Sequence, residues 1–134
     1  MIRQIITGPV RNDRAGAGYF GAPRGGRKHR GVDYVVTPGN EVLSPVSGTV
    51  ERLGWAYARD DTWRIVDIRA VDGFLHRVFY VEPMVDAGQE VTRFTVIGLA
   101  QDISAFYPDS GMKPHVHYEV INTEGRHIDP EEWL

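Results

Sequence analysis

The chain has 134 residues, of which 42% are hydrophobic and 25% charged, and it contains no cysteine. A chain of this length can bury about two-thirds of the surface that its unfolded form exposes, so we expect one domain spanning residues 1–134. The lack of cysteine excludes disulfides and all cysteine-ligated metal sites, which leaves His, Asp and Glu as possible ligands. A formal net charge of −3 argues against a protein that binds nucleic acid through bulk positive charge.

Short apolar runs separated by Gly, Pro and Asp turns predict an all-β fold with a compact antiparallel sheet. The expected strands are 1–6, 31–36, 41–43, 48–53, 62–70, 75–81, 94–99 and 114–120. Asp72-Gly73 predicts a hairpin with a tight primed turn. Helical periodicity is absent except for one possible turn in 129–134. The loops expected at 11–30 and 100–114 are long enough to suggest a function.

The strand predicted at 114–120 carries His115 and His117, separated by one residue. Side chains alternate along a strand, so both imidazoles share a face and lie roughly 6.5–7 Å apart. One imidazole can therefore bind a metal while the other acts on water or substrate at that metal. The alternative is that both are strand histidines whose nitrogens bond to backbone groups.

His29 and Asp33 form a second candidate pair, four residues apart, at the predicted junction of a loop and a strand. Gly31 between them permits a sharp turn, so both side chains can converge on one point. Together with the His-x-His strand they offer two imidazoles and one carboxylate, a pattern typical of a catalytic zinc site. The alternative is that Asp33 only caps a turn.

An ordered set of motifs resembles the lysostaphin/LytM-type zinc metallopeptidases, which cleave glycylglycine and peptidoglycan cross-links. The resemblance covers nearly the whole chain. The matching pieces are Gly18-Tyr19-Phe20-Gly21, His29-x-x-x-Asp33, residues 42–50, 85–91 and 96–98, Pro114-His115-Val116-His117-Tyr118-Glu119, and Asp129-Pro130.

The resemblance implies a zinc ion held by His29, Asp33 and His117, with His115 as the general base. It also implies a lysostaphin-like fold of the duplicated-hybrid-motif type, in which long loops wall the zinc groove. The implied activity is zinc-dependent hydrolysis of the peptide cross-links of peptidoglycan.

One segment, Val78 to Pro83, departs from the family pattern. The family usually carries a second catalytic histidine there, and Tyr80 occupies that position. The segment is similar to that of leukocyte cell-derived chemotaxin, a secreted vertebrate member of the fold regarded as a signalling protein. We hypothesise that Tyr80 donates a hydrogen bond to the oxyanion instead. His76 lies roughly 13 Å from Tyr80 along a strand, too far to replace it, and we expect it to be solvated or paired across strands.

Several rival interpretations stay open. The protein can be a non-catalytic, zinc-stabilised binding or structural module of the same fold. A lipoyl- or biotinyl-type carrier is disfavoured because the lysine expected at a hairpin tip is missing. The basic segment Arg24-Gly25-Gly26-Arg27-Lys28 can attract carboxylates or phosphates, or it can be a solvated loop. We expect Tyr57 or Tyr107 to contact ligand, and His127 to be exposed.

The first nine residues are too short and polar for a signal peptide, and no run is long enough to span a membrane. For a cell-wall enzyme this suggests a phage product, delivered by a tail or released at lysis into the periplasm or cell wall. Virion or tail proteins are then possible partners.

Overall fold

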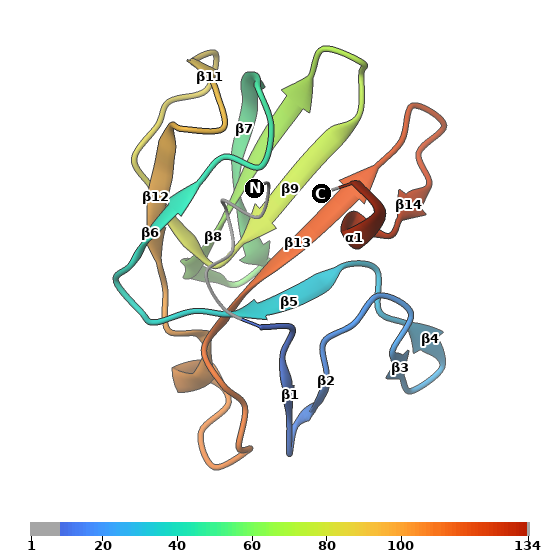
Figure 1. Ribbon diagram of the computed structural model, residues 1–134. Helices are drawn as coiled ribbons and strands as arrows, with labels where there is room; N and C mark the ends of the chain where they lie inside the picture. Colours follow the sequence, from blue (N-terminus) through green and yellow to red (C-terminus); the bar gives the residue numbers. More distant parts are fainter. Residues whose placement is uncertain (1–8, 134) are drawn as a thin grey trace.

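The computed structural model describes residues 9–133, and nearly all of its regular structure is antiparallel β (Figure 1). The main sheet has the order β11-β7-β8-β9-β13-β14, and β5 also pairs with β13. Its strands are β5 (Val32–Val35), β7 (Gly48–Tyr57), β8 (Asp60–Ala70), β9 (Leu75–Phe79), β11 (Glu90–Val91), β13 (His115–Ile121) and β14 (His127–Ile128). The predicted all-β, antiparallel architecture is confirmed.

Smaller elements surround the main sheet. A second sheet has the order β10 (Val81–Pro83), β12 (Val96–Ala100) and β6 (Glu41–Leu43). The N-terminal part forms two hairpins, β1 (Asn12–Asp13) with β2 (Gly16–Ala17), and β3 (Pro23–Arg24) with β4 (Arg27–Lys28). The helical elements are the 3-10 turn η1 (Ile103–Phe106) and α1 (Pro130–Trp133).

The structure corrects several of the predicted boundaries. The loop expected at 11–30 contains the two small hairpins; Gly25 in the second turn and Gly16, the first residue of β2, have positive φ. The strand expected at 75–81 is interrupted at Tyr80, which separates β9 from β10. In the β8–β9 turn only Gly73 of the Asp72-Gly73 pair has positive φ, so the turn is not the primed type we predicted. The strand expected at 1–6 lies outside the described residues.

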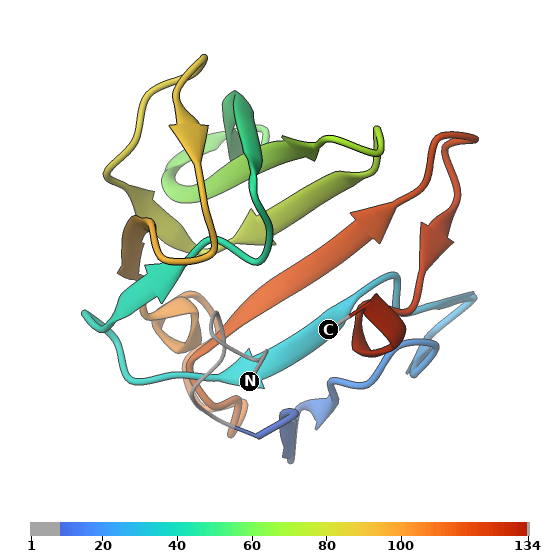
Figure 2. The ribbon, with the colours of Figure 1, turned by 45° about the horizontal axis from the view of Figure 1, so that its top comes forward.

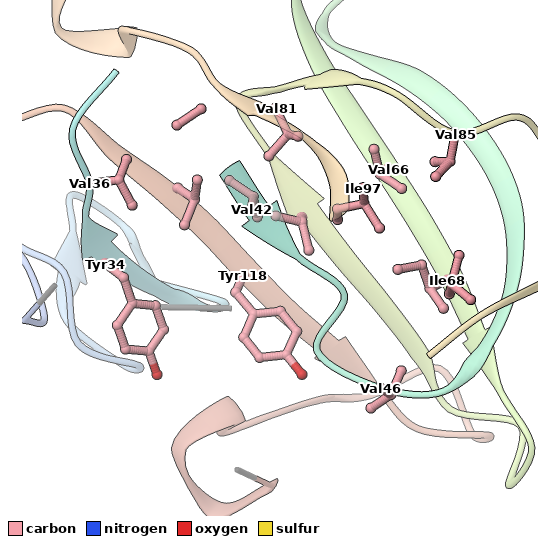
Figure 3. Close-up of a cluster of buried hydrophobic side chains, with 14 of the residues drawn as sticks. Tyr34, Val36, Val42, Val46, Val66, Ile68, Val81, Val85, Ile97 and Tyr118 are labelled. Carbon is pink, nitrogen blue, oxygen red and sulfur yellow. The ribbon is translucent and has the colours of Figure 1, made fainter. Parts of the chain in front are cut away.

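The core lies on one face of the main sheet, beneath the second sheet. Figure 3 shows Tyr34 of β5 and Tyr118 of β13 side by side, with Val42 and Ile97 of the second sheet nearby. All four side chains are almost fully buried. Because side chains alternate along a strand, the neighbours of these tyrosines must project from the opposite face.

The register between β5 and β13 fixes what that opposite face carries. The two strands run side by side in both ribbon views (Figures 1 and 2), with His117 opposite Asp33 and Tyr118 opposite Val32. Gly31 lies just before β5, where a Cβ atom would collide with the Tyr118 carbonyl oxygen. The same Cβ would come within 3.0 Å of Glu119 Cγ and His117 Cε1. Gly31 therefore allows the chain to pass close to β13.

His76 belongs to the core face, not to the site face. It is fully buried in β9, and its Nδ1 lies 2.7 Å from the Tyr118 hydroxyl on the neighbouring strand. Burial lowers the pKa of His76 to about 4, against a smaller opposing effect of Asp72. Of the two environments we expected, pairing across strands is confirmed.

This buried histidine predicts a loss of stability in acid. The unfolded chain takes up the proton more readily, so the contribution of His76 is fully present above about pH 6.5 and is lost as pH falls toward 4. We expect His76 to lower the free energy of unfolding by on the order of 3 kcal/mol at pH 4. Urea unfolding of wild type and His76→Phe at several pH values measures this.

The substitution also removes the bond to Tyr118, so the variant is less stable at every pH, and the pH slope is the informative quantity. A slope between pH 6.5 and 4 that is unchanged in His76→Phe would contradict the prediction.

Candidate metal centre

Three predicted ligands converge on the face of the main sheet opposite the core. His117 Nδ1 lies 2.7 Å from Asp33 Oδ1 and 3.1 Å from His29 Nε2, and the latter two atoms are 3.3 Å apart. Tetrahedral ligands about 2.1 Å from a common ion lie roughly 3.4 Å from one another. The three atoms thus have nearly the spacing that a zinc ion requires, and the set of two nitrogens and one carboxylate oxygen suits zinc.

Hydrogen bonds to the far ring nitrogens orient both imidazoles. His29 Nδ1 lies 3.0 Å from the Tyr19 carbonyl oxygen, which can only accept, so this nitrogen carries the proton. His117 Nε2 lies 2.9 Å from Glu119 Oε2, a carboxylate oxygen that accepts in the same way. The nitrogens that face one another, His29 Nε2 and His117 Nδ1, are therefore the ones available to an ion.

Charge in the centre favours cation binding. Burial would raise the pKa of Asp33, but the hydrogen bond from His117, the contact with His29 and the charge of His117 hold it well below its ordinary value. Burial would likewise lower the pKa of His117, yet the bonds and charges of Asp33 and Glu119 raise it to about 9. A metal ion bound at neutral pH would take the place of that proton on His117.

His115 lies beside the three ligands without joining them. Its Nδ1 donates to the Lys113 carbonyl oxygen at 2.9 Å, and its Nε2 lies 3.7 Å from Asp33 Oδ2. Burial lowers the pKa of His115 below its ordinary value, although Asp33 partly offsets this. The imidazole is therefore neutral at pH 7, with the lone pair of Nε2 directed toward the centre.

Tyr80 reaches the centre through an unusual backbone conformation. Its φ of 73° lies in the left-handed region, which side chains other than glycine rarely adopt. This breaks the alternation of the strand, so that both Phe79 and Tyr80 line the cavity. The Tyr80 ring packs edge to face on His115, with centroids 5.6 Å apart. Burial raises the pKa of Tyr80 to about 12, so its hydroxyl keeps its proton at neutral pH.

The centre opens into a cavity of about 590 Å³. All five predicted site residues line it: His29, Asp33, Tyr80, His115 and His117. Tyr57 and Tyr107, one of which we expect to contact ligand, both line the cavity. Their hydroxyls continue a row from Tyr80, with 3.2 Å between Tyr80 and Tyr57 and 2.8 Å between Tyr57 and Tyr107.

Glu119 is a functional residue that the sequence reasoning missed. Besides holding His117, it accepts a hydrogen bond from His127 Nε2 at 3.0 Å, so His127 is not simply exposed as we expected. Arg77 Nη1 lies 3.9 Å from Glu119 Oε1 across the strand pair. The same guanidinium forms a bidentate contact with the buried Asp67. The sequence pattern could have predicted that Glu119 faces the site, because Glu119 has the same strand parity as His115 and His117.

Residues 27–130 match the sequence profile of Peptidase family M23. The chain belongs to this family. A protein named uncharacterized metalloprotease from Haemophilus influenzae is 33% identical over 107 residues, which are 78% of this chain and 20% of that protein. Mouse leukocyte cell-derived chemotaxin-2 is 27% identical over 122 residues, which are 91% of this chain and 76% of that protein.

The solved catalytic domain of the antimicrobial peptidase lysostaphin from Staphylococcus simulans has the same fold. Its TM-score is 0.66 at 22% identity, with 88% of this chain and 89% of that chain covered. The predicted family and the lysostaphin-like fold are thereby confirmed. Members of the M23 family are zinc metallopeptidases, and the His-Asp-His group can hold a metal ion. Our chain spans only about a fifth of the Haemophilus protein.

The position of Glu119 predicts a role in metal affinity. Glu119→Gln keeps an acceptor for His117 but removes the charge that makes the imidazole a stronger ligand. We expect zinc affinity to fall about 10- to 100-fold. Competition with a chelator of known affinity measures the change. Glu51→Gln serves as the control, because Glu51 is an exposed glutamate bound to Arg69; equal affinities of all three proteins would contradict the role of Glu119.

Proposed function

We propose that this chain is a zinc-dependent endopeptidase that hydrolyses peptide cross-links of bacterial peptidoglycan. The observation that carries the proposal is the orientation of His115. Its Nδ1 proton is engaged by the Lys113 carbonyl, so Nε2 presents a lone pair beside the metal ligands. A general base needs a free lone pair near the reacting water, and His115 offers one because it neither binds the metal nor packs in the core. Membership of the M23 family and the lysostaphin-like fold support the choice of reaction.

The chemistry divides among few side chains. His29, Asp33 and His117 would hold zinc, which would supply Lewis acidity to acidify water and polarise a peptide carbonyl. His115 Nε2 accepts the proton of the attacking water and then gives it to the leaving amine nitrogen. The lowered pKa of His115 keeps the imidazole neutral and ready to accept that proton at pH 7.

Tyr80 supplies the second catalytic group in this proposal. The oxygen of the attacked carbonyl gains negative charge, and a neutral O–H donor stabilises it. The raised pKa of Tyr80 keeps the hydroxyl protonated, and its edge-to-face contact with His115 holds it next to the base. Tyr57 bonds to the same hydroxyl and helps to fix its direction.

A second candidate function is a non-catalytic, zinc-stabilised binding module of the same fold. Two observations favour it, namely tyrosine at position 80 and the 27% identity to chemotaxin-2 over most of both chains. Zinc content does not separate the two functions, because both retain the ligands. Hydrolysis of purified peptidoglycan does.

A phage origin remains our prediction for how such an enzyme reaches its substrate. A tail-associated protein or a lysin meets peptidoglycan in the periplasm or cell wall, and virion proteins would then be its partners. Location of the gene among tail or lysis genes would support this origin, and a host gene with an upstream signal sequence would contradict it.

The proposed base predicts that His115→Ala retains zinc but loses activity. Removing a general base typically costs about 10²- to 10⁴-fold in rate. Release of soluble fragments from purified peptidoglycan measures activity, and atomic emission measures bound zinc. Wild-type protein that holds one zinc ion and releases no fragments would instead favour the binding module.

The hydroxyl of Tyr80 predicts a second, separable loss. Tyr80→Phe keeps the ring against His115 and removes only the donor, so we expect kcat to fall about 10²- to 10³-fold. Steady-state hydrolysis of a cross-linked peptide measures kcat and KM. Tyr19→Phe is the matched control, because the Tyr19 side chain is 52% exposed and does not line the cavity. Activity of Tyr80→Phe equal to that of wild type would exclude the role.

A further inference from the structure

The cavity that holds the metal ligands has a strongly basic wall. Four arginines line it, against two carboxylates. The arginines are Arg11, Arg24, Arg27 and Arg30, and the carboxylates are Asp33 and Glu119. The whole chain has a formal net charge of −3, so this positive field is local to the cavity.

Both carboxylates of the cavity are already engaged. Asp33 accepts from His117 and, through its second oxygen, from Arg11 Nε at 3.2 Å. Glu119 accepts from His117 and His127. A bound divalent cation adds further positive charge, so the field that a substrate meets stays positive despite the two carboxylates.

The four arginines form two pairs, one bonded to other groups of the protein and one exposed. Arg11 is buried and also contacts Asp13 at 2.7 Å, while Arg24 donates to the Ala17 carbonyl oxygen at 2.7 Å. Arg27 and Arg30 line the cavity but remain exposed. In the part of the chain that the structure describes, neither side chain has a hydrogen bond or an ion pair. Two guanidinium groups are therefore available to a ligand.

The basic wall adjoins the metal centre itself. Arg24 Nη2 lies 3.8 Å from Asp33 Oδ2, and Arg27 and Arg30 share one cavity with the ligands. An anionic group bound there would therefore share the cavity with the scissile bond. In a peptide such a group is a carboxylate, which guanidinium binds with two parallel hydrogen bonds.

We propose that Arg27 and Arg30 form a carboxylate subsite, and that the enzyme acts on cross-link peptides with a free carboxylate next to the scissile bond. The carboxylate is either an acidic side chain or a chain terminus. Neutral bridges such as oligoglycine are poor substrates. This inference rests on the proposed endopeptidase function and assigns its substrate class.

The test uses two cross-linked peptides that differ only in a carboxylate or carboxamide beside the scissile bond. Zinc-loaded wild type should cleave the carboxylate peptide with a kcat/KM at least about tenfold higher, as a charged hydrogen bond provides. Arg27→Gln/Arg30→Gln should abolish this preference, so that the two peptides are cleaved with equal kcat/KM. Lys28→Gln is the matched control, because Lys28 is exposed on the same hairpin but does not line the cavity.

Binding separates this inference from the proposed reaction. The affinities of both peptides for zinc-loaded His115→Ala, with and without the arginine substitutions, are measured by calorimetry, which requires no hydrolysis. Tighter binding of the carboxylate peptide that disappears with Arg27 and Arg30 supports the subsite even if wild type proves inactive. Equal binding of the two peptides overturns it, even if the cavity also binds inorganic phosphate. Absence of hydrolysis alone counts only against the endopeptidase.

Discussion

The pairing of β5 with β13 is the constraint on which the site depends. Because His117 stands opposite Asp33, two ligands from distant parts of the chain meet across one strand pair. The same register places Tyr34 and Tyr118 in the core, so burial of the core face enforces the position of the site face. A slip by one residue would exchange the two faces and bury charged groups, which is prohibitively costly.

Support for the metal centre extends well beyond its ligands. Glu119 links His117 to a row of charges across the sheet, in which Arg77 and Arg52 both contact Asp67. Asp67 is almost fully buried, so removing both arginines would leave a buried charge unpaired. This row fixes the carboxylate that sets the His117 tautomer, and it couples the stability of the sheet to the orientation of a ligand.

Strand parity made much of this structure predictable. The His-x-His pattern and the spacing from His29 to Asp33 identified the residues that now line one cavity, and most strands begin within a few residues of the expected positions. The partners that orient them were not predictable, because the carbonyls of Tyr19 and Lys113 come from irregular segments whose path no periodicity describes. The position of Tyr80 in the site was expected, but its backbone conformation was not, because a positive φ breaks the alternation on which parity arguments rest.

The choice between enzyme and binding module turns on features that zinc binding alone does not need. A structural site is complete with its ligands and their hydrogen-bond partners. This one also holds a buried, neutral histidine beside the ligands and a tyrosine in a backbone conformation that costs on the order of 1–3 kcal/mol. The hydrogen bonds from the Tyr80 amide to the Arg64 carbonyl and from the Gln101 amide to the Tyr80 carbonyl offset that cost. Their effect is to aim a phenol at the cavity, where it would donate to the oxyanion in the proposed reaction, and Tyr80 is not one of the three residues that can hold the metal.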